Sequence, residues 1–141
     1  MIRVVETDRE IENCYPVMQI LRPDIEARSF VAQVRKQQKM GYRLVAVLTD
    51  NQPVSVAGYR ISENLAWGRF LYIDDLVTSV DQRSKGHGAA LLAWLKMEAE
   101  REGCDQMHLD SGLQRLDAHR FYEREGVKKT GYHFAESFSA K

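Results

Sequence analysis

The sequence predicts a single α/β (α+β) domain built on a mixed, mostly antiparallel sheet. Its 141 residues suit one domain with its own core, and its composition, 44% hydrophobic and 28% charged, is typical of a globular protein. Strand-like and helical patterns alternate along the chain without a repeat. Near the middle, a basic turn with two glycines joins an apolar strand to an amphipathic helix. We therefore expect residues 1–141 to form one domain.

The first part of the chain is expected to hold four strands and a pair of helices. Alternating apolar residues indicate strands, and apolar spacings of three and four indicate helices. Thr7 or Asp8 can cap the first helix, and Gly41 ends the second. The expected strands cover residues 2–5, 43–48, 54–61 and 68–77, and the expected helices cover 9–20 and 24–40. The last three of these strands form an antiparallel meander.

The second part of the chain is expected to return to the sheet twice. A helix follows Gly86 and stops at Gly103, with an apolar face that includes Leu91 and Leu95. The remaining elements are a strand over residues 106–110, a helix over 116–125 and a closing strand over 128–138. A strand, a helix and a strand in succession around the glycine turn imply a parallel pair, so the sheet is mixed.

Charge and cysteine usage narrow the class of protein. Twenty basic and twenty acidic residues cancel, so no overall field attracts nucleic acid or an anionic membrane. No apolar run reaches membrane-spanning length, and we expect a cytoplasmic protein. Cys14 and Cys104 have no CxxC or CxxH neighbours, which favours free thiols over a metal site. We expect no metal, no membrane and no nucleic-acid partner.

The glycine turn has the features of an anion site. Gly86 and Gly88 let the backbone approach a ligand closely, and the first amides of the following helix have no partner within that helix. Arg83 and Lys85 add positive charge beside the helix dipole. The turn matches neither a Walker motif nor a dinucleotide fingerprint. A tight turn without a ligand is the alternative interpretation.

Three segments together resemble the GNAT superfamily of acyl-CoA N-acyltransferases, in particular its small bacterial-type acetyltransferases. Arg83–Gly88 is similar to the motif Q/R-x-x-G-x-G/A, and the acidic and apolar run Asp74–Val77 precedes it at the usual spacing. Ala118–Val127 resembles the segment A-x-x-F/L-Y-x-x-x-G-F. The resemblance implies a sheet of about six to seven strands, about four helices and a V-shaped cleft between two central parallel strands.

The resemblance also implies acetyl-CoA as cosubstrate. Backbone groups at the end of the motif's strand would pair with the pantetheine arm, and the amides of the glycine turn would surround the pyrophosphate. The implied cofactor-binding residues are Leu76, Val77, Thr78, Arg83, Ser84, Lys85, Gly86, His87, Gly88 and Ala89. Arg115 departs from the family, which often has asparagine there, so a cofactor contact from that position is open.

Acetyl transfer to an amine needs a base for the amine and an acid for the leaving thiolate. By the resemblance, Tyr122 is the acid, although a core aromatic with a bonded hydroxyl is the alternative. Asp74 and Asp75 are the leading candidates for the base, and strand alternation is expected to point them to opposite faces. His119 and His133 are alternative bases, since histidine titrates near neutrality.

Several features of acceptor binding stay open at the level of sequence. Asp110 and Ser111 follow a predicted strand and either bind substrate or cap the next turn. The expected activity is direct transfer of acetyl, in a ternary complex, to a primary amine of a small molecule or protein. The alternatives are a non-catalytic acyl-CoA sensor and an acetyltransferase acting on aminoacyl-tRNA. Aromatic residues near the C-terminus suggest a homodimer, namely Tyr132, Phe134 and Phe138, with His133 among them.

Overall fold

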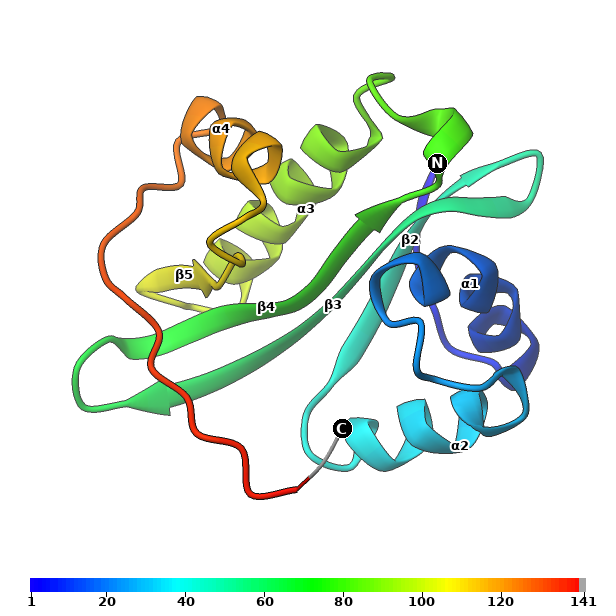
Figure 1. The fold of residues 1–141 in the computed structure, drawn as a ribbon, viewed down its shortest axis with the longest axis horizontal. Helices are drawn as coiled ribbons and strands as arrows, with labels where there is room; N and C mark the ends of the chain where they lie inside the picture. The colour runs from blue at the N-terminus through cyan, green and yellow to red at the C-terminus, as the bar shows by residue number, and fades with distance from the viewer. Residues whose placement is uncertain (140–141) are drawn as a thin grey trace. The chain divides into compact units, whose positions relative to one another are not determined.

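The computed structural model describes residues 1–139 and contains four α-helices and five strands (Figure 1). In chain order the elements are β1 (Ile2–Val4), α1 (Asp8–Leu21), α2 (Ala27–Gln38), β2 (Arg43–Thr49), β3 (Gln52–Asn64), β4 (Gly68–Thr78), a short 3-10 helix (Val80–Gln82), α3 (His87–Arg101), β5 (Gln106–Leu109) and α4 (Leu116–Arg124). The chain divides into two compact units, one ending at Leu109 and the other beginning at Asp110. Within residues 1–139, no helix is long and apolar enough to cross a membrane.

The first unit contains one mixed sheet in the order β1-β2-β3-β4-β5. Neighbouring strands from β1 to β4 pair antiparallel, and β4 pairs parallel with β5 through the crossover helix α3. The predicted mixed, mostly antiparallel sheet and the predicted number of helices are therefore confirmed. The longest ladder joins β3 to β4, from Ser55 opposite Thr78 to Asn64 opposite Gly68.

The predicted strand number of six to seven is wrong for the described residues, which form five strands. The expected strand over residues 128–138 is absent, and its side chains are exposed. Alternating apolar residues give a segment the ability to form a strand, but a strand also needs a neighbour that supplies the ladder of hydrogen bonds. The sequence pattern carries no information about that neighbour.

Helices α1 and α2 form the main core with one face of the sheet. Thr7 caps α1 as predicted, because its hydroxyl accepts from the Glu10 amide while the Glu10 carboxylate accepts from the Thr7 amide. The fully or nearly buried core residues on this face are Ile11, Cys14, Val17, Met18, Phe30, Val34, Leu44, Ala46, Val56 and Val77. This core packs α1 against β3 and β4.

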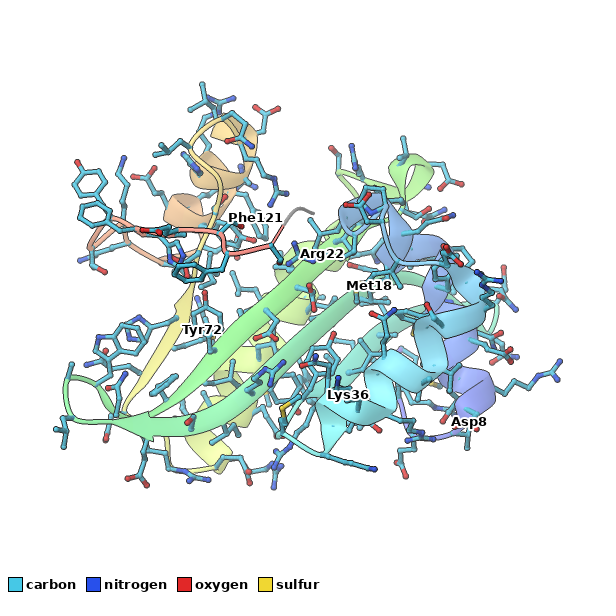
Figure 2. All side chains as sticks on the ribbon, turned by 60° about the horizontal axis from the view of Figure 1, so that its bottom comes forward. Asp8, Met18, Arg22, Lys36, Tyr72 and Phe121 are labelled. Carbon is cyan, nitrogen blue, oxygen red and sulfur yellow. The ribbon has the colours of Figure 1, made fainter. Side chains whose placement is uncertain are left out.

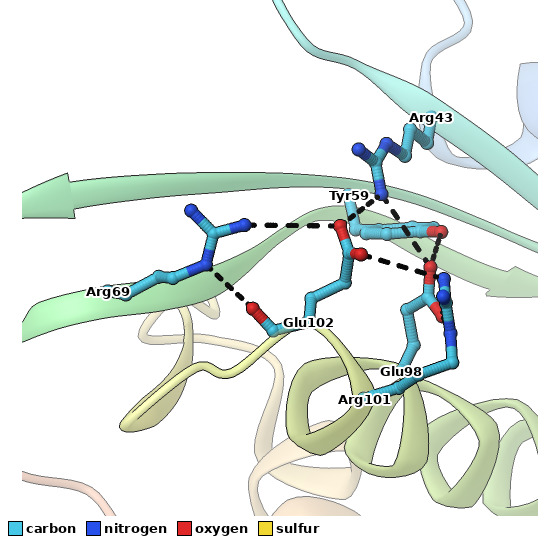
Figure 3. A network of polar contacts seen from close by, with 6 residues as sticks. All are labelled: Arg43, Tyr59, Arg69, Glu98, Arg101 and Glu102. Atoms are coloured by element: carbon cyan, nitrogen blue, oxygen red, sulfur yellow. Dashed lines mark hydrogen bonds and ion pairs between the residues drawn. The ribbon is translucent and has the colours of Figure 1, made fainter.

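Helix α3 covers the opposite face and is attached to it by a polar cluster. We call Arg43, Tyr59, Arg69, Glu98, Arg101 and Glu102 the α3 cluster (Figure 3). Tyr59 donates to Glu98 Oε2 at 3.0 Å, and Arg101 Nε donates to Glu98 Oε1 at 2.8 Å. Arg43 bridges Glu98 and Glu102, while Arg69 donates to the Glu102 carbonyl at 2.7 Å. The cluster ties the C-terminal turn of α3 to three strands.

The second unit contains α4 and the irregular segments on either side of it. The helix begins after Arg115, and its first turn carries Asp117. Its amphipathic sequence buries Tyr122, which is 9% exposed and packs edge to face with Phe121. Gly126, with a φ of 88°, follows the helix end as predicted from the sequence.

Candidate active site

A β-bulge lies at the acidic pair of β4. Gly58 on β3 is opposite Asp75, and the next residue, Tyr59, is opposite Ile73, so Asp74 is an extra residue without a partner on β3. A bulge interrupts strand alternation and can turn neighbouring side chains toward the same face. Here Asp74 bonds Arg60 and Asp75 bonds Tyr42. The expectation that the two carboxylates point to opposite faces is therefore wrong.

The position of Tyr42 shows on which face of the sheet Asp74 and Asp75 lie. A Cβ added to Gly58 would lie 1.9 Å from the Tyr42 hydroxyl oxygen, so the phenol ring crosses β3 directly above this glycine. Arg60 is two residues from Gly58 and faces the same way, whereas Tyr59 faces α3. Both carboxylates thus lie on the α1 and α2 side of the sheet. A glycine inside a predicted strand was the one sequence signal for this close approach.

Both oxygens of the Asp75 carboxylate are engaged. Arg22 Nε donates to Oδ1 at 2.8 Å, and the Tyr42 hydroxyl donates to Oδ2 at 2.8 Å. Burial and the neighbouring Asp75 charge raise the pKa of Tyr42 well above its ordinary value. Tyr42 therefore stays protonated and acts as a hydrogen-bond donor.

Asp74 is held less completely than Asp75. Arg60 Nε donates to its Oδ2 at 2.9 Å, and within residues 1–139 its Oδ1 accepts no hydrogen bond. Burial raises the pKa of the Asp74 carboxyl, and Arg60 partly opposes this shift. Asp74 thus combines a raised pKa with an oxygen available to a substrate. Sequence patterns do not reveal Arg22, Tyr42 or Arg60, which reach the pair from distant parts of the chain.

Beyond the bulge, the last residues of β4 pair with β3 but with no second strand within residues 1–139. The pairing of β4 with β5 ends where Ile73 lies opposite Leu109, but β4 continues to Thr78. The Ser79 amide donates to the Val54 carbonyl, so by alternation the backbone of Val77 faces β3, whereas Leu76 and Thr78 face the other way. Ser55 supports this arrangement by donating to the Val77 carbonyl at 3.1 Å.

The glycine turn contains two left-handed residues just before α3. Gly86 has a φ of 84° and immediately precedes α3, and Ser84 has a φ of 64°. Residues 83–86 are exposed, and the helix starting at His87 presents its first amides without intrahelical partners. His87 Nε2 lies 3.3 Å from Gln82 Oε1. The exposed basic side chains and the left-handed turn fit a pyrophosphate group.

The second unit holds the remaining predicted site residues. Burial raises the pKa of the Tyr122 phenol, and Arg115 partly opposes this shift. The unit brings Asp110 and His133 together, with Oδ1 and Nδ1 3.5 Å apart. His119 Nε2 lies 2.7 Å from the Gly112 carbonyl oxygen, so this ring nitrogen makes a hydrogen bond to the backbone of the same unit. Within residues 1–139, the buried Ser111 hydroxyl has no hydrogen-bond partner.

Both cysteines are free thiols. Burial raises the pKa of Cys14 to about 12, so this thiol is unreactive near neutral pH. Burial also raises the pKa of Cys104, which is partly exposed. Within residues 1–139, no group of three or more histidine, cysteine, aspartate or glutamate residues is arranged to hold a metal ion.

The sequence comparisons show the family of this chain, and a structural comparison shows its fold. The sequence profile of the acetyltransferase (GNAT) family matches residues 8–127. An uncharacterized N-acetyltransferase of Bacillus subtilis (strain 168), YhdJ, is 33% identical over 122 residues, which are 86% of each chain. An aminoalkylphosphonate N-acetyltransferase of Salmonella typhimurium is 38% identical over 65 residues, 46% of this chain and 42% of the relative. The structure of the aminoglycoside N-acetyltransferase AAC(6')-Iy with CoA aligns with a TM-score of 0.85 at 13% identity, covering 99% and 96% of the two chains.

Proposed function

Because this chain belongs to the GNAT family of acetyltransferases, we propose that it transfers acetyl from acetyl-CoA directly to a primary amine of a small molecule or a protein. The observation that carries this proposal is the position of Asp74. Its Oδ1, which accepts no hydrogen bond in the described part of the chain, lies at a bulge, immediately before the residues of β4 that extend past β5. A proton acceptor and a backbone edge for the cosubstrate are thus adjacent along one strand.

The cosubstrate would be held mainly by backbone groups and would supply the acetyl thioester. Leu76 and Thr78 present amide and carbonyl groups away from β3, which suits an extended pantetheine arm. The amides of residues 86–89, with Arg83 and Lys85, suit the pyrophosphate. These are among the cofactor-binding residues that the family resemblance implies.

Asp74 rather than Asp75 is the proposed general base. The attacking amine must lose a proton, and the acceptor of that proton needs a free lone pair and a pKa raised toward neutrality. Asp74 has both features, whereas the oxygens of Asp75 already accept from Arg22 and Tyr42. Asp75 is proposed to orient the site.

Tyr122 is the proposed acid for the leaving thiolate. A phenol is protonated near neutral pH, and burial raises the pKa of Tyr122 further, so a proton is present when the carbon–sulfur bond breaks. The proton balance is then complete, because Asp74 takes one proton from the amine and Tyr122 gives one to sulfur.

A thiol-release assay with acetyl-CoA tests the function. The panel of acceptors should include polyamines, amino acids, aminoalkylphosphonates, aminoglycosides and lysine peptides. With the best acceptor, we expect Asp74→Asn to lower kcat by about 100-fold or more, since general base catalysis contributes about 10²–10⁴-fold. Asp8→Asn is a matched control, because Asp8 also pairs with an arginine, Arg35, but lies at the start of α1.

Two results would contradict the proposal in different ways. Binding of CoA without turnover of any acceptor would favour a non-catalytic acyl-CoA sensor. Turnover that survives both Asp74→Asn and Tyr122→Phe would retain an acetyltransferase but remove the assigned roles. Affinity for tRNA that falls steeply with salt would instead favour an aminoacyl-tRNA acceptor.

We also propose that two copies associate through the C-terminal segment. Tyr132, Phe134 and Phe138 are 83%, 91% and 93% exposed, and apolar surface of this kind is often covered by a partner. Light scattering on the whole chain should give a dimer mass that Phe134→Ser with Phe138→Ser reduces to a monomer. A monomer mass for the unaltered chain would contradict this association.

A further inference from the structure

Arg22 connects the end of α1 to the bulge of β4. It caps the C-terminus of the helix, and its guanidinium extends to β4, more than fifty residues further along the chain (Figure 2). Nε donates to Asp75 Oδ1 at 2.8 Å, and Nη2 donates to the Asp74 carbonyl at 2.9 Å. One side chain therefore contacts both residues of the acidic pair.

We propose that Arg22 is a positioning residue for acetyl transfer, which fixes the β4 bulge and the Asp75 carboxylate so that Asp74 is left free to accept the amine proton. This inference rests on the proposed role of Asp74 as the base. Arg22 itself does not touch the reacting atoms in this scheme. It acts through the backbone and charge of its two contacts.

The backbone contact is the first argument. Asp74 has no partner on β3, so the bulge disrupts the ladder at this residue. Arg22 donates to the Asp74 carbonyl, in a bond with a charged donor, which is stronger than a neutral one. The second hydrogen bond of the same guanidinium, to Asp75, fixes the orientation of its planar set of N–H donors, which we call the fork. The direction of the Asp74 side chain is thereby set from α1.

Charge balance is the second argument. Four groups face the Asp74 carboxylate within the first unit: Arg60 from β3, Asp75 from β4, Arg22 from α1 and the Tyr42 phenol before β2. Asp75 raises the pKa of Asp74, and Arg22 lowers it. Without Arg22, the charge of Asp75 would be opposed by a hydrogen bond from Tyr42 alone.

The test compares Arg22→Gln with a matched control, Arg35→Gln. Arg35 makes the same kind of contacts, from its Nε to Asp8 Oδ1 and from its Nη2 to the Glu6 carbonyl, and its side chain is 40% exposed against 47% for Arg22. For each variant, kcat and kcat/KM for the amine are measured against pH with saturating acetyl-CoA. A thermal unfolding curve is recorded for each protein.

We expect Arg22→Gln to lower kcat about tenfold and to move the acidic limb of the pH profile upward, because loss of a nearby opposite charge raises a carboxyl pKa. Adding Asp75→Asn to Arg22→Gln should move the limb back. Arg22→Lys retains the charge but loses the fork, so it should lower kcat without moving the limb. Arg35→Gln should leave both quantities unchanged.

Three outcomes would overturn the positioning role. They are an acidic limb in Arg22→Gln that coincides with that of the control, a limb that Asp75→Asn does not restore, and an Arg22→Lys variant with full kcat. If Arg22→Gln fails to fold, the Arg22→Lys result decides alone. Full activity of Asp74→Asn would instead remove the proposed base, so the two failures are distinguishable.

Discussion

Each face of the sheet carries a cluster of arginine, tyrosine and carboxylate side chains, but the carboxylates of the two clusters are hydrogen-bonded to different extents. The bulge cluster, Arg22, Tyr42, Arg60, Asp74 and Asp75, lies on the α1 and α2 face, and the α3 cluster lies on the opposite face. Each contains a buried tyrosine that donates to a carboxylate, at 2.8 Å in one and 3.0 Å in the other. Each also draws arginines from separate elements.

The difference between the clusters is how completely their carboxylates are bonded. In the α3 cluster three arginines face two glutamates, and both oxygens of the buried Glu98 have partners. In the bulge cluster two arginines face two aspartates, and one oxygen of Asp74 accepts no bond within residues 1–139. Full bonding suits a structural attachment, whereas an available oxygen at a strand irregularity suits chemistry.

Removal of Glu98 should have the largest effect on stability. Glu98→Ala leaves the Tyr59 hydroxyl buried without its acceptor, and Arg43 and Arg101 each lose one of their two carboxylate partners and keep only Glu102. We expect the free energy of unfolding, measured in urea, to fall by about 3 kcal/mol, with kcat of the folded enzyme unchanged. Glu100→Ala, an exposed change on the same helix, is the control. A loss of kcat with full stability would reverse the assignment of roles.

Gly58→Ala should disturb the bulge cluster and lower both the stability and the kcat of the protein. The added Cβ would overlap the Tyr42 ring, so the phenol must move and release Asp75. We expect a loss of about 2 kcal/mol in unfolding free energy, as for other overpacked sites, together with a lower kcat. In a Tyr42→Ala background the same change should cost little more, because the overlap no longer exists. Additive losses would show that the Tyr42 contact is not the cause.

Local sequence rules predicted the elements whose causes are local. Thr7 is followed three residues later by Glu10, and together they form the capping box that starts α1. Gly86 and Gly103 adopt positive φ at the two ends of α3, as the glycine pattern indicated. The turn between β4 and α3 and the acidic pair before it were also found from sequence.

The parts that sequence did not predict depend on contacts between distant residues. The bulge at Asp74 appears only when β3 and β4 are paired, and Arg60 and Arg22 reach the acidic pair from 14 and 53 residues away. Alternation at Tyr132 and Phe134 predicted a strand, but whether it forms depends on a neighbouring edge. Hydrophobic period and secondary-structure propensity describe a single segment of sequence. The bulge, the arginine contacts and the pairing of a last strand each depend on two segments that are far apart in the sequence.

The buried tyrosines of the two clusters, Tyr42 and Tyr59, give the comparison with the smallest expected effect. Burial, with the adjacent Glu98, raises the pKa of Tyr59 to about 12. The unfolded chain loses this proton near pH 10, so the native state binds more protons between pH 10 and 12, and stability should fall as pH rises through that window. Tyr59→Phe removes this slope, which is at most about 1.4 kcal/mol per pH unit, and below pH 10 it costs about 1 kcal/mol for the lost hydrogen bond.

Urea unfolding at several pH values, with and without Tyr59→Phe, measures this difference. The matched change Tyr42→Phe in the bulge cluster removes the donor to Asp75 and should lower kcat, whereas Tyr59→Phe should leave kcat unchanged. Each change removes one hydroxyl from a buried tyrosine. A difference between their effects on kcat therefore comes from the carboxylate that each hydroxyl contacts and from the groups around it. Equal losses of kcat would mean that both clusters support the site in the same way, and the distinction drawn from Asp74 would fail.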